Sequence, residues 1–223
     1  MPLLYSRSGG VGRMTFDFPE KKNALDQDAR KEMERILTQV RDDENVRALL
    51  ISGTGGAFCA GGDINTFASS TPMAMRDRLK QQHRVTQMLY NLEKPVIAAV
   101  AGPAFGVGFN IALLADVIIA APSARFCQAY AKVAIVPDGG GLYLLSRVVG
   151  TQRAKLYANE MAQRVTNEAL QIHGHNGYTR EYPLERMVRD ARGFALGGGT
   201  VEILRNTIAA MVYGHSFNQR RGG

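Results

Sequence analysis

The stretch that decides the fold is Gly102-Pro-Ala-Phe-Gly-Val-Gly-Phe-Asn-Ile-Ala-Leu-Leu-Ala-Asp116. The apolar run at 95–101 leads into it, and its Val and Ile content between Pro and Gly predicts a strand buried on both faces. Gly106 and Gly108 permit a tight turn and close approach to a ligand, and a buried helix is expected from Phe109. A strand, a glycine turn and a helix start gather free backbone N–H groups. The segment is therefore either an anion site or an ordinary β-turn-α junction.

A second junction of the same kind lies earlier in the chain. Residues 46–52 predict another buried strand, which runs into Gly53-Thr-Gly-Gly-Ala-Phe-Cys-Ala-Gly-Gly-Asp-Ile64. Two loops of small residues can offer two N–H donors to one oxygen. Such an oxyanion hole stabilises a thioester carbonyl as it becomes an enolate.

The paired motifs Ala57-Phe-Cys-Ala-Gly-Gly-Asp-Ile64 and Gly102-Pro-Ala-Phe-Gly-Val-Gly-Phe-Asn110 resemble those of the enoyl-CoA hydratase/isomerase, or crotonase, superfamily. The likeness covers about residues 1–153. It implies an α/β fold in which ββα units wind as a spiral, which periodicity alone does not supply. It also implies an acyl-CoA substrate, whose coenzyme A enters as part of the substrate, with no separate cofactor. By position, the N–H groups of Gly62 and Val107 are the oxyanion donors.

Composition narrows the function classes. The 223 residues are 45% hydrophobic, typical of one globular domain or a domain with an appendage. The net charge of +7 favours anionic ligands, but the basic residues are scattered, so no nucleic-acid partner is expected. Cys59 and Cys127 are too few for a disulfide framework or a zinc site, so free thiols and no metal are expected. With no 18-residue apolar run and no signal-peptide pattern, we expect a soluble cytoplasmic protein with no membrane partner.

Local signals predict the elements before the tail. Residues 3–18 alternate around Gly9-Gly10 as a hairpin. Asp26 is expected to cap a helix to about Arg41, and Thr71-Pro72 to begin one that ends near Glu93. The apolar side chains of the second helix pack in the core or line an acyl pocket; they are Met73, Met75, Leu79, Met88 and Leu89. Short strands at 117–121 and 124–128 and a helix at 142–149 follow.

The resemblance also implies where the substrate binds. The family uses the Asn-Ala-Leu stretch at 23–25 to line the CoA site, so Lys21 or Lys22 either meets a CoA phosphate or is a solvated lysine. Asp63 is among the substrate-binding positions; it follows the first loop and is interpreted as a structural cap or loop anchor. The other substrate-binding positions carried over are Ala24, Ala60, Gly61, Ile64, Gly106, Asn110 and Tyr130.

Hydration requires a carboxylate to activate water and another to protonate carbon. The two positions at which hydratases of the family carry Glu are occupied here by Asn110 and Tyr130. Neither side chain is a carboxylate base, which disfavours water addition by that route.

One carboxylate remains well placed for catalysis. Ile135-Val-Pro-Asp-Gly-Gly-Gly141 is similar to a segment of double-bond-shifting and ring-forming isomerases, especially the epoxyphenylacetyl-CoA isomerase branch. There the Asp moves a proton beside the thioester, so Asp138 is the candidate base. Pro-Asp-Gly is also a strong turn sequence, and Asp138 could instead cap the following helix.

The tail departs from the crotonase pattern. Residues 154–221, with Gln171-Ile-His-Gly174 and Gly197-Gly-Gly-Thr200, resemble the C-terminal end of acyl-CoA dehydrogenases. We therefore predict a core at 1–153 and a helical segment at 154–223, with helices at 152–172, 183–194 and 200–213. Leu156, Met161, Val165, Ala169 and Ile172 form the apolar face of the first. We expect this tail to pack on the core as a helical cover.

Flavin binding is not expected from this tail. Gln171, Gly174 and Thr200 match positions that contact FAD in dehydrogenases, but a common catalytic base position there is Gly198, and the rest of a flavin site is missing. The chain is thus predicted to be an acyl-CoA-binding isomerase. The expected assembly is a homo-oligomer built on a trimer. Alternatives are a hydratase, a non-catalytic acyl-CoA binder and a flavin-dependent dehydrogenase.

Overall fold

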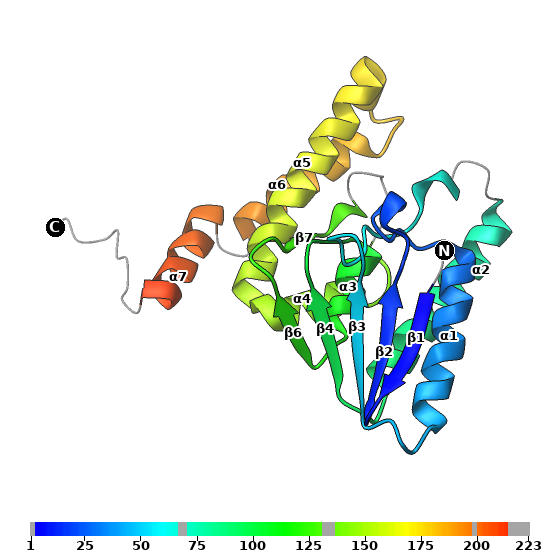
Figure 1. Ribbon diagram of the computed structural model, residues 1–223. Coiled ribbons are helices and arrows are strands. Elements are labelled where there is room, and N and C mark those ends of the chain that lie inside the picture. Colours follow the sequence, from blue (N-terminus) through cyan, green and yellow to red (C-terminus); the bar gives the residue numbers. More distant parts are fainter. Residues whose placement is uncertain (1–2, 67–70, 131–136, 198–199, 214–223) are drawn as a thin grey trace. The chain divides into compact units, whose positions relative to one another are not determined.

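The computed structural model describes residues 3–66, 71–130, 137–197 and 200–213 (Figure 1). The chain divides into two compact units, Met1–Leu144 and Leu145–Gly223. The junction expected near 153/154 falls inside a helix of the second unit, α5 (Thr151–Gly177). The division into a core at 1–153 and a tail at 154–223 stays a prediction, as does the packing of the tail on the core.

A five-stranded sheet forms the first unit, in the order β1-β2-β3-β4-β6. β1 and β2 are antiparallel, as the predicted hairpin requires, and every other neighbouring pair is parallel. Met14 on β2 pairs with Ile51 on β3, which pairs with Ala98 on β4. The strands are β1 (Leu3–Ser8), β2 (Val11–Phe16), β3 (Ala48–Gly53), β4 (Val96–Val100) and β6 (Val117–Ala120).

A second, shorter layer of pairing joins the loops that follow the sheet strands. β5 (Pro103–Phe105) and β7 (Arg125–Cys127) are parallel, and single parallel bridges join Cys59 to Ala104 and Leu25 to Gly62. Strand, short strand and helix therefore recur along the chain. This second layer brings the two predicted glycine loops together.

The helices of this part begin where their capping residues predict. Asp26 Oδ1 accepts a 2.8 Å hydrogen bond from Ala29 N at the start of α1, and Thr71 Oγ1 accepts one of 3.2 Å from Ala74 N at the start of α2. α3 begins at Val107, two residues before the predicted start. The segments are η1 (Pro19–Lys21), α1 (Gln27–Asp42), η2 (Ile64–Thr66), α2 (Pro72–Tyr90), α3 (Val107–Leu113) and α4 (Gly141–Val149).

The expectation that residues 95–101 form a strand buried on both faces was wrong. On β3 and β4 fully buried residues such as Leu49 and Ala98 alternate with partly exposed ones, and on the edge strand β6 Ile119 is 61% exposed. Side chains on a strand alternate between faces, so only one face of this sheet is fully covered.

The predicted inner face of α2 is also corrected. Met73 is 63% exposed and Leu79 is 40% exposed. Leu89 is buried as predicted, at 2% exposed, but the rest of the buried stripe consists of Gln81, Gln82 and Val85. Gln82 can be buried because its Oε1 accepts a hydrogen bond from the buried Arg30 on the neighbouring α1.

The second unit is helical, as predicted, with α5, α6 (Leu184–Gly197) and α7 (Val201–Tyr213). α6 and α7 both contact α5, and Arg205 Nη2 lies 2.6 Å from Glu160 Oε1. Gly174 has φ 54° and interrupts α5 close to its predicted end. Thr200 Oγ1 accepts a 3.3 Å bond from Ile203 N, which confirms the predicted cap.

The apolar face predicted for the first tail helix is mostly not buried. Leu156 is 8% exposed, but Met161, Val165 and Ile172 are 39%, 37% and 83% exposed. Helices α6 and α7 do not cover that stripe. Gly198 lies outside the described residues, as do Ile135 and Val136 of the isomerase-like segment.

None of the described helices combines the length and apolar character needed to cross a bilayer.

The Asp26 cap gives a direct test of the fold. Replacing Asp26 with Ala leaves an amide of the first turn of α1 without its acceptor and should lower the free energy of unfolding by about 1 kcal/mol. Urea denaturation measures the change. The matched control is Asp28→Ala, in the same turn but 83% exposed at its side chain, which should change stability by less than about 0.5 kcal/mol. Equal effects would contradict the capping role.

Candidate functional site

A cavity of about 150 Å³ lies in the first unit where the two glycine loops meet. It brings together loop residues, the turn around residue 138 and side chains from α1 and α2, although these segments are far apart in the sequence. Its walls are Arg30, Ala60, Gly61, Gly62, Ile64, Met75, Arg78, Leu79, Gly106, Val107, Ala129, Tyr130 and Asp138.

Backbone hydrogen bonds hold the two loops against each other. Cys59 N donates to Pro103 O at 3.0 Å, and Phe105 N donates back to Cys59 O at 2.9 Å. The N-terminal turn of α3 also needs glycine at 108, because a Cβ there would lie 2.3 Å from Cys59 O. The close approach anticipated for Gly108 is thus to the neighbouring loop.

The two predicted oxyanion donors face this one cavity. Val107 is the first residue of α3, so its N–H has no intrahelical acceptor. Within the described part of the chain, neither Val107 N nor Gly62 N donates to a protein acceptor, although their neighbours Asp63 N and Gly106 N do. Both N–H groups therefore lack a protein acceptor among the described residues beside this cavity, and their binding of a ligand oxygen stays a prediction.

Asp138 belongs to a chain of side-chain hydrogen bonds. Tyr130 Oη donates to Asp138 Oδ1 at 2.5 Å, and Asn110 Nδ2 donates to Tyr130 Oη and to Asp138 O, both at 2.8 Å. Burial, followed by the charge of Asp138, raises the pKa of Tyr130, so the phenol stays a donor. Asn110 does not line the cavity; it supports the two residues that do.

Arg30 is a site residue that the sequence reasoning missed. It is 2% exposed and reaches the cavity from α1, with Nε donating to Gln82 Oε1 at 3.0 Å and Nη1 to Asp26 O at 2.8 Å. Burial and then the nearby Arg78 lower the pKa of Arg30 to about 10, so it stays cationic at neutral pH. The available signal was an arginine within the apolar face of a helix, between Ala29 and Met33.

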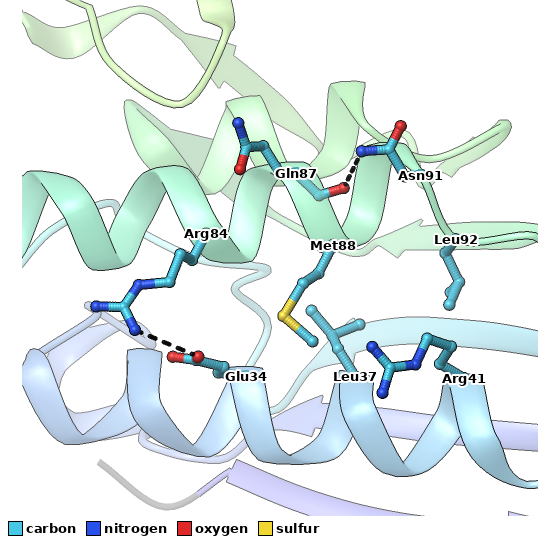
Figure 2. Close-up of a pocket in the computed structure, with 8 residues that line it drawn as sticks. All are labelled: Glu34, Leu37, Arg41, Arg84, Gln87, Met88, Asn91 and Leu92. Carbon is cyan, nitrogen blue, oxygen red and sulfur yellow. Dashed lines mark hydrogen bonds and ion pairs between the residues drawn. The ribbon is translucent and has the colours of Figure 1, made fainter.

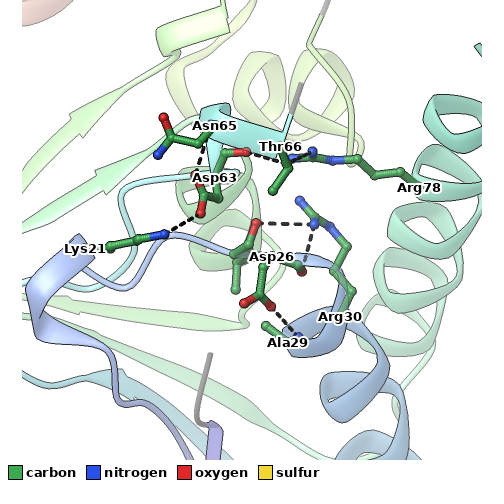
Figure 3. A network of polar contacts seen from close by, with 9 residues as sticks. Lys21, Asp26, Ala29, Arg30, Asp63, Asn65, Thr66 and Arg78 are labelled. Carbon is green, nitrogen blue, oxygen red and sulfur yellow. Dashed lines mark hydrogen bonds and ion pairs between the residues drawn. The ribbon is translucent and has the colours of Figure 1, made fainter. Parts of the chain in front are cut away.

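Arg78 enters the same cavity from α2. Its Nη1 donates to Thr66 Oγ1 at 2.6 Å (Figure 3). Its Nη2 lies 2.6 Å from where a Cβ on Gly62 would be, and the Nη2 of Arg30 lies 3.4 Å from the same point. Two guanidinium groups therefore flank the first oxyanion loop.

Asp63 has the anchoring role expected of it. Lys21 Nζ lies 2.9 Å from Asp63 Oδ2, and Asn65 N donates to Asp63 Oδ1 at 3.0 Å (Figure 3). The hydrogen bond from Lys21 is the main cause that lowers the pKa of Asp63. Asp63 thus holds the loop that follows Gly62.

The remaining residues predicted on the CoA side lie outside this cavity. Lys22 is exposed with φ 49°, and its carbonyl accepts a 2.9 Å hydrogen bond from Ala60 N. Ala24 is half-buried. Lys22, Ala24 and Asp63 do not line the 150 Å³ cavity. Contacts of Lys22 and Ala24 with CoA stay predictions.

Asn23 is fully buried and has a structural role that the sequence reasoning missed. Its Nδ2 donates to Ala57 O at 2.9 Å and to Thr54 O at 3.0 Å, while its Oδ1 accepts from Phe18 N at 2.7 Å. The amide therefore fixes the start of the first oxyanion loop.

Both cysteines are free thiols, as predicted. Cys59 is completely buried between the loops, and this burial raises the pKa of its thiol to about 12. It is a packing residue rather than a nucleophile.

A larger cavity, about 340 Å³, lies between α1 and α2 (Figure 2). The Arg84 and Glu34 side chains approach within 3.7 Å across it, and Asn91 Nδ2 donates to Gln87 O at 2.8 Å. Among its described lining residues the acidic group is this ion-paired Glu34, with no adjacent loop amides. Size alone therefore does not identify the site.

Comparisons with known proteins agree with this geometry. The chain is 36% identical over 166 residues to 1,2-epoxyphenylacetyl-CoA isomerase of Escherichia coli, covering 71% of this chain and 63% of that protein. It is 36% identical over 171 residues to short-chain-enoyl-CoA hydratase of Clostridium acetobutylicum, covering 76% and 66%. The chain spans about three fifths of the length of several curated relatives it matches.

Solved structures show the same fold. The enoyl-CoA hydratase/isomerase of Cupriavidus metallidurans superposes with a TM-score of 0.63 at 30% identity, covering 96% of this chain and 94% of that one. An enoyl-CoA hydratase of Mycobacterium avium gives 0.62 at 32% identity, covering 68% and 60%. The predicted crotonase-like α/β fold is thereby confirmed, whereas the dehydrogenase-like origin of the tail stays a prediction.

The family model for enoyl-CoA hydratase/isomerase matches residues 6–176 and so extends beyond the predicted junction at 153. With two loop amides, a carboxylate and this match, the chain belongs to the enoyl-CoA hydratase/isomerase family.

Proposed function

We propose that this chain is an enoyl-CoA isomerase, which moves a double bond along an acyl-CoA thioester. The observation that carries the proposal is that Asp138 supplies the carboxylate among the described residues of a cavity that also holds the Gly62 and Val107 amides. One base beside an oxyanion hole is sufficient for a proton shuttle.

The reaction has two proton transfers and no net redox change. The thioester oxygen accepts hydrogen bonds from Gly62 N and Val107 N. Asp138 removes a proton from the α-carbon of a 3-enoyl thioester, and the electron pair moves to the oxygen to give a dienolate. Protonated Asp138 then returns the proton at the γ-carbon, giving the 2-enoyl thioester. Each donor to the enolate oxygen contributes about 3 kcal/mol.

The surroundings of Asp138 support a positioned base. Tyr130 holds one carboxylate oxygen and Asn110 holds the Asp138 backbone carbonyl. The alternative role, capping the next helix, finds less support, because the described contact of α4 is Gly141 N to the Asp138 backbone carbonyl.

Hydration is the second candidate, favoured by the name of the C. acetobutylicum relative. The two positions that would carry its carboxylates hold Asn110 and Tyr130, which are bonded to each other at 2.8 Å. A non-catalytic acyl-CoA binder is the third possibility. We further propose that the protein uses no FAD and assembles as a homo-oligomer; these two statements rest on the sequence.

Removing one oxyanion donor should abolish turnover. Gly62→Pro deletes the N–H and should lower kcat for 3-hexenoyl-CoA isomerisation by about 100-fold or more. The matched control is Gly62→Ala, which meets Arg78 with the same Cβ but keeps the N–H, and it should retain far more activity. A folded Gly62→Pro protein with normal kcat would contradict the assignment.

Neutralising the base should stop the proton shuttle without preventing binding. Asp138→Asn keeps the size and a hydrogen-bond acceptor for Tyr130 and should lower kcat by about 10²–10⁴-fold. Exchange of α-protons of butyryl-CoA in D₂O, followed by NMR, should fall in parallel, while the Kd of butyryl-CoA stays within about threefold of the original because the amides remain. Undiminished exchange would exclude Asp138 as the base.

Water addition should be weak. Because Asn110 and Tyr130 replace the two carboxylates, crotonyl-CoA should be hydrated at a rate at least about 100-fold below double-bond migration. Loss of the ultraviolet absorbance of the conjugated enoyl thioester measures hydration by the same preparation. Hydration as fast as isomerisation would favour the second candidate.

A further inference from the structure

The acyl end of the cavity carries more positive charge than proton transfer requires. Arg30 and Arg78 both line it, and Asp138 is the carboxylate among its described residues. Proton transfer from a neutral acyl chain uses the loop amides and one base. The pair of arginines is therefore unexplained by the proposed reaction.

Arg30 is held in place by neutral groups. Among the described residues its hydrogen-bond acceptors are Gln82 Oε1, Leu25 O and Asp26 O. The charges of Asp138 and Asp26 favour its cationic form, but neither carboxylate accepts a hydrogen bond from it among these contacts. These bonds orient Nε and Nη1 and leave Nη2 toward Gly62, at 3.4 Å from the Cβ position on that residue.

Arg78 places a second guanidinium on the same spot. Its Nη2 lies 2.6 Å from the same Cβ position, so the two cations converge beside the loop that would bind the thioester. Burial disfavours the charge and lowers the pKa of Arg78, as it does for Arg30. Two guanidinium groups at one point match the planar, bidentate geometry of a carboxylate.

We propose that the acyl group recognised by this site carries its own carboxylate, which Arg30 and Arg78 bind. The inference rests on the proposed acyl-CoA function and names its substrate class. Ile64, Met75 and Leu79 provide the apolar wall for the methylene groups between thioester and carboxylate.

The test measures binding of unreactive thioesters to the full chain by calorimetry. Succinyl-CoA and glutaryl-CoA carry the carboxylate, and 4-methylpentanoyl-CoA and 5-methylhexanoyl-CoA replace it with an isopropyl group of the same shape. At least one carboxylate ligand should bind about tenfold or more tightly than its neutral counterpart, as expected for a charge-assisted pair. Equal Kd values within both pairs would overturn the proposal.

Two variants assign the preference to the cavity. Arg78→Met should reduce it to about threefold or less, whereas Arg78→Lys should keep part of it because the charge remains. Arg84→Met is the matched control, since Arg84 lies on the same helix but pairs with Glu34 outside this cavity. A preference that survives Arg78→Met and Arg30→Met, or one lost in Arg84→Met, would contradict the assignment.

Failure of this inference and failure of the isomerase proposal have different signatures. Isomerisation of 3-hexenoyl-CoA without any preference for the carboxylate ligands overturns the carboxylate inference alone. A carboxylate preference in a protein that isomerises no enoyl thioester overturns the isomerase proposal alone.

Discussion

The site depends on the backbone contact between the two glycine loops. Cys59 and the 103–105 strand exchange hydrogen bonds. Gly108 lets the start of α3 approach Cys59 O so closely that a Cβ would not fit between them. Each loop follows a parallel strand of the same sheet, so the sheet fixes where each loop begins. The short second layer then fixes their separation. A larger residue at 108 would push α3 away from Cys59 and so separate the backbone amides of residues 62 and 107.

Polar side chains that do not contact the cavity hold the remaining parts. Asn23 fixes the start of the first loop, Lys21 and Asp63 hold its end, and Asn110 positions both Tyr130 and the turn at Asp138. Asn23, Asn110 and Asp63 are buried, so the hydrogen bonds they make would be costly to lose, whereas Lys21 is exposed. Asn110 and Tyr130, at the positions predicted to carry Glu in hydratases, thus hydrogen-bond to each other and to Asp138.

The arginines give the cavity a character that neither loop has alone. Oxyanion donors and a base can serve any acyl group, whereas convergent guanidinium groups discriminate among acyl groups by charge. Their carriers, α1 and α2, lie side by side (Figure 2) and are separate from the loops. The proposed oxyanion donors thus come from the strand-to-helix loops, and the proposed carboxylate-binding arginines come from the helices.

Local sequence patterns predicted the secondary-structure elements and the functional groups that the loops carry. The Asp26 and Thr71 caps, the hairpin at 3–18, the glycine junctions and Asp138 are local patterns, and local patterns report backbone conformation and available functional groups. The resemblance of the two loop motifs added the spiral fold. Only the tertiary structure decided which residues converge. Arg30 and Gln82 are 52 residues apart, and no periodicity pairs them. Burial on one sheet face, the exposure of Met73 and the polar inner stripe of α2 likewise depend on neighbours distant in the chain, because burial is a property of packing rather than of any segment.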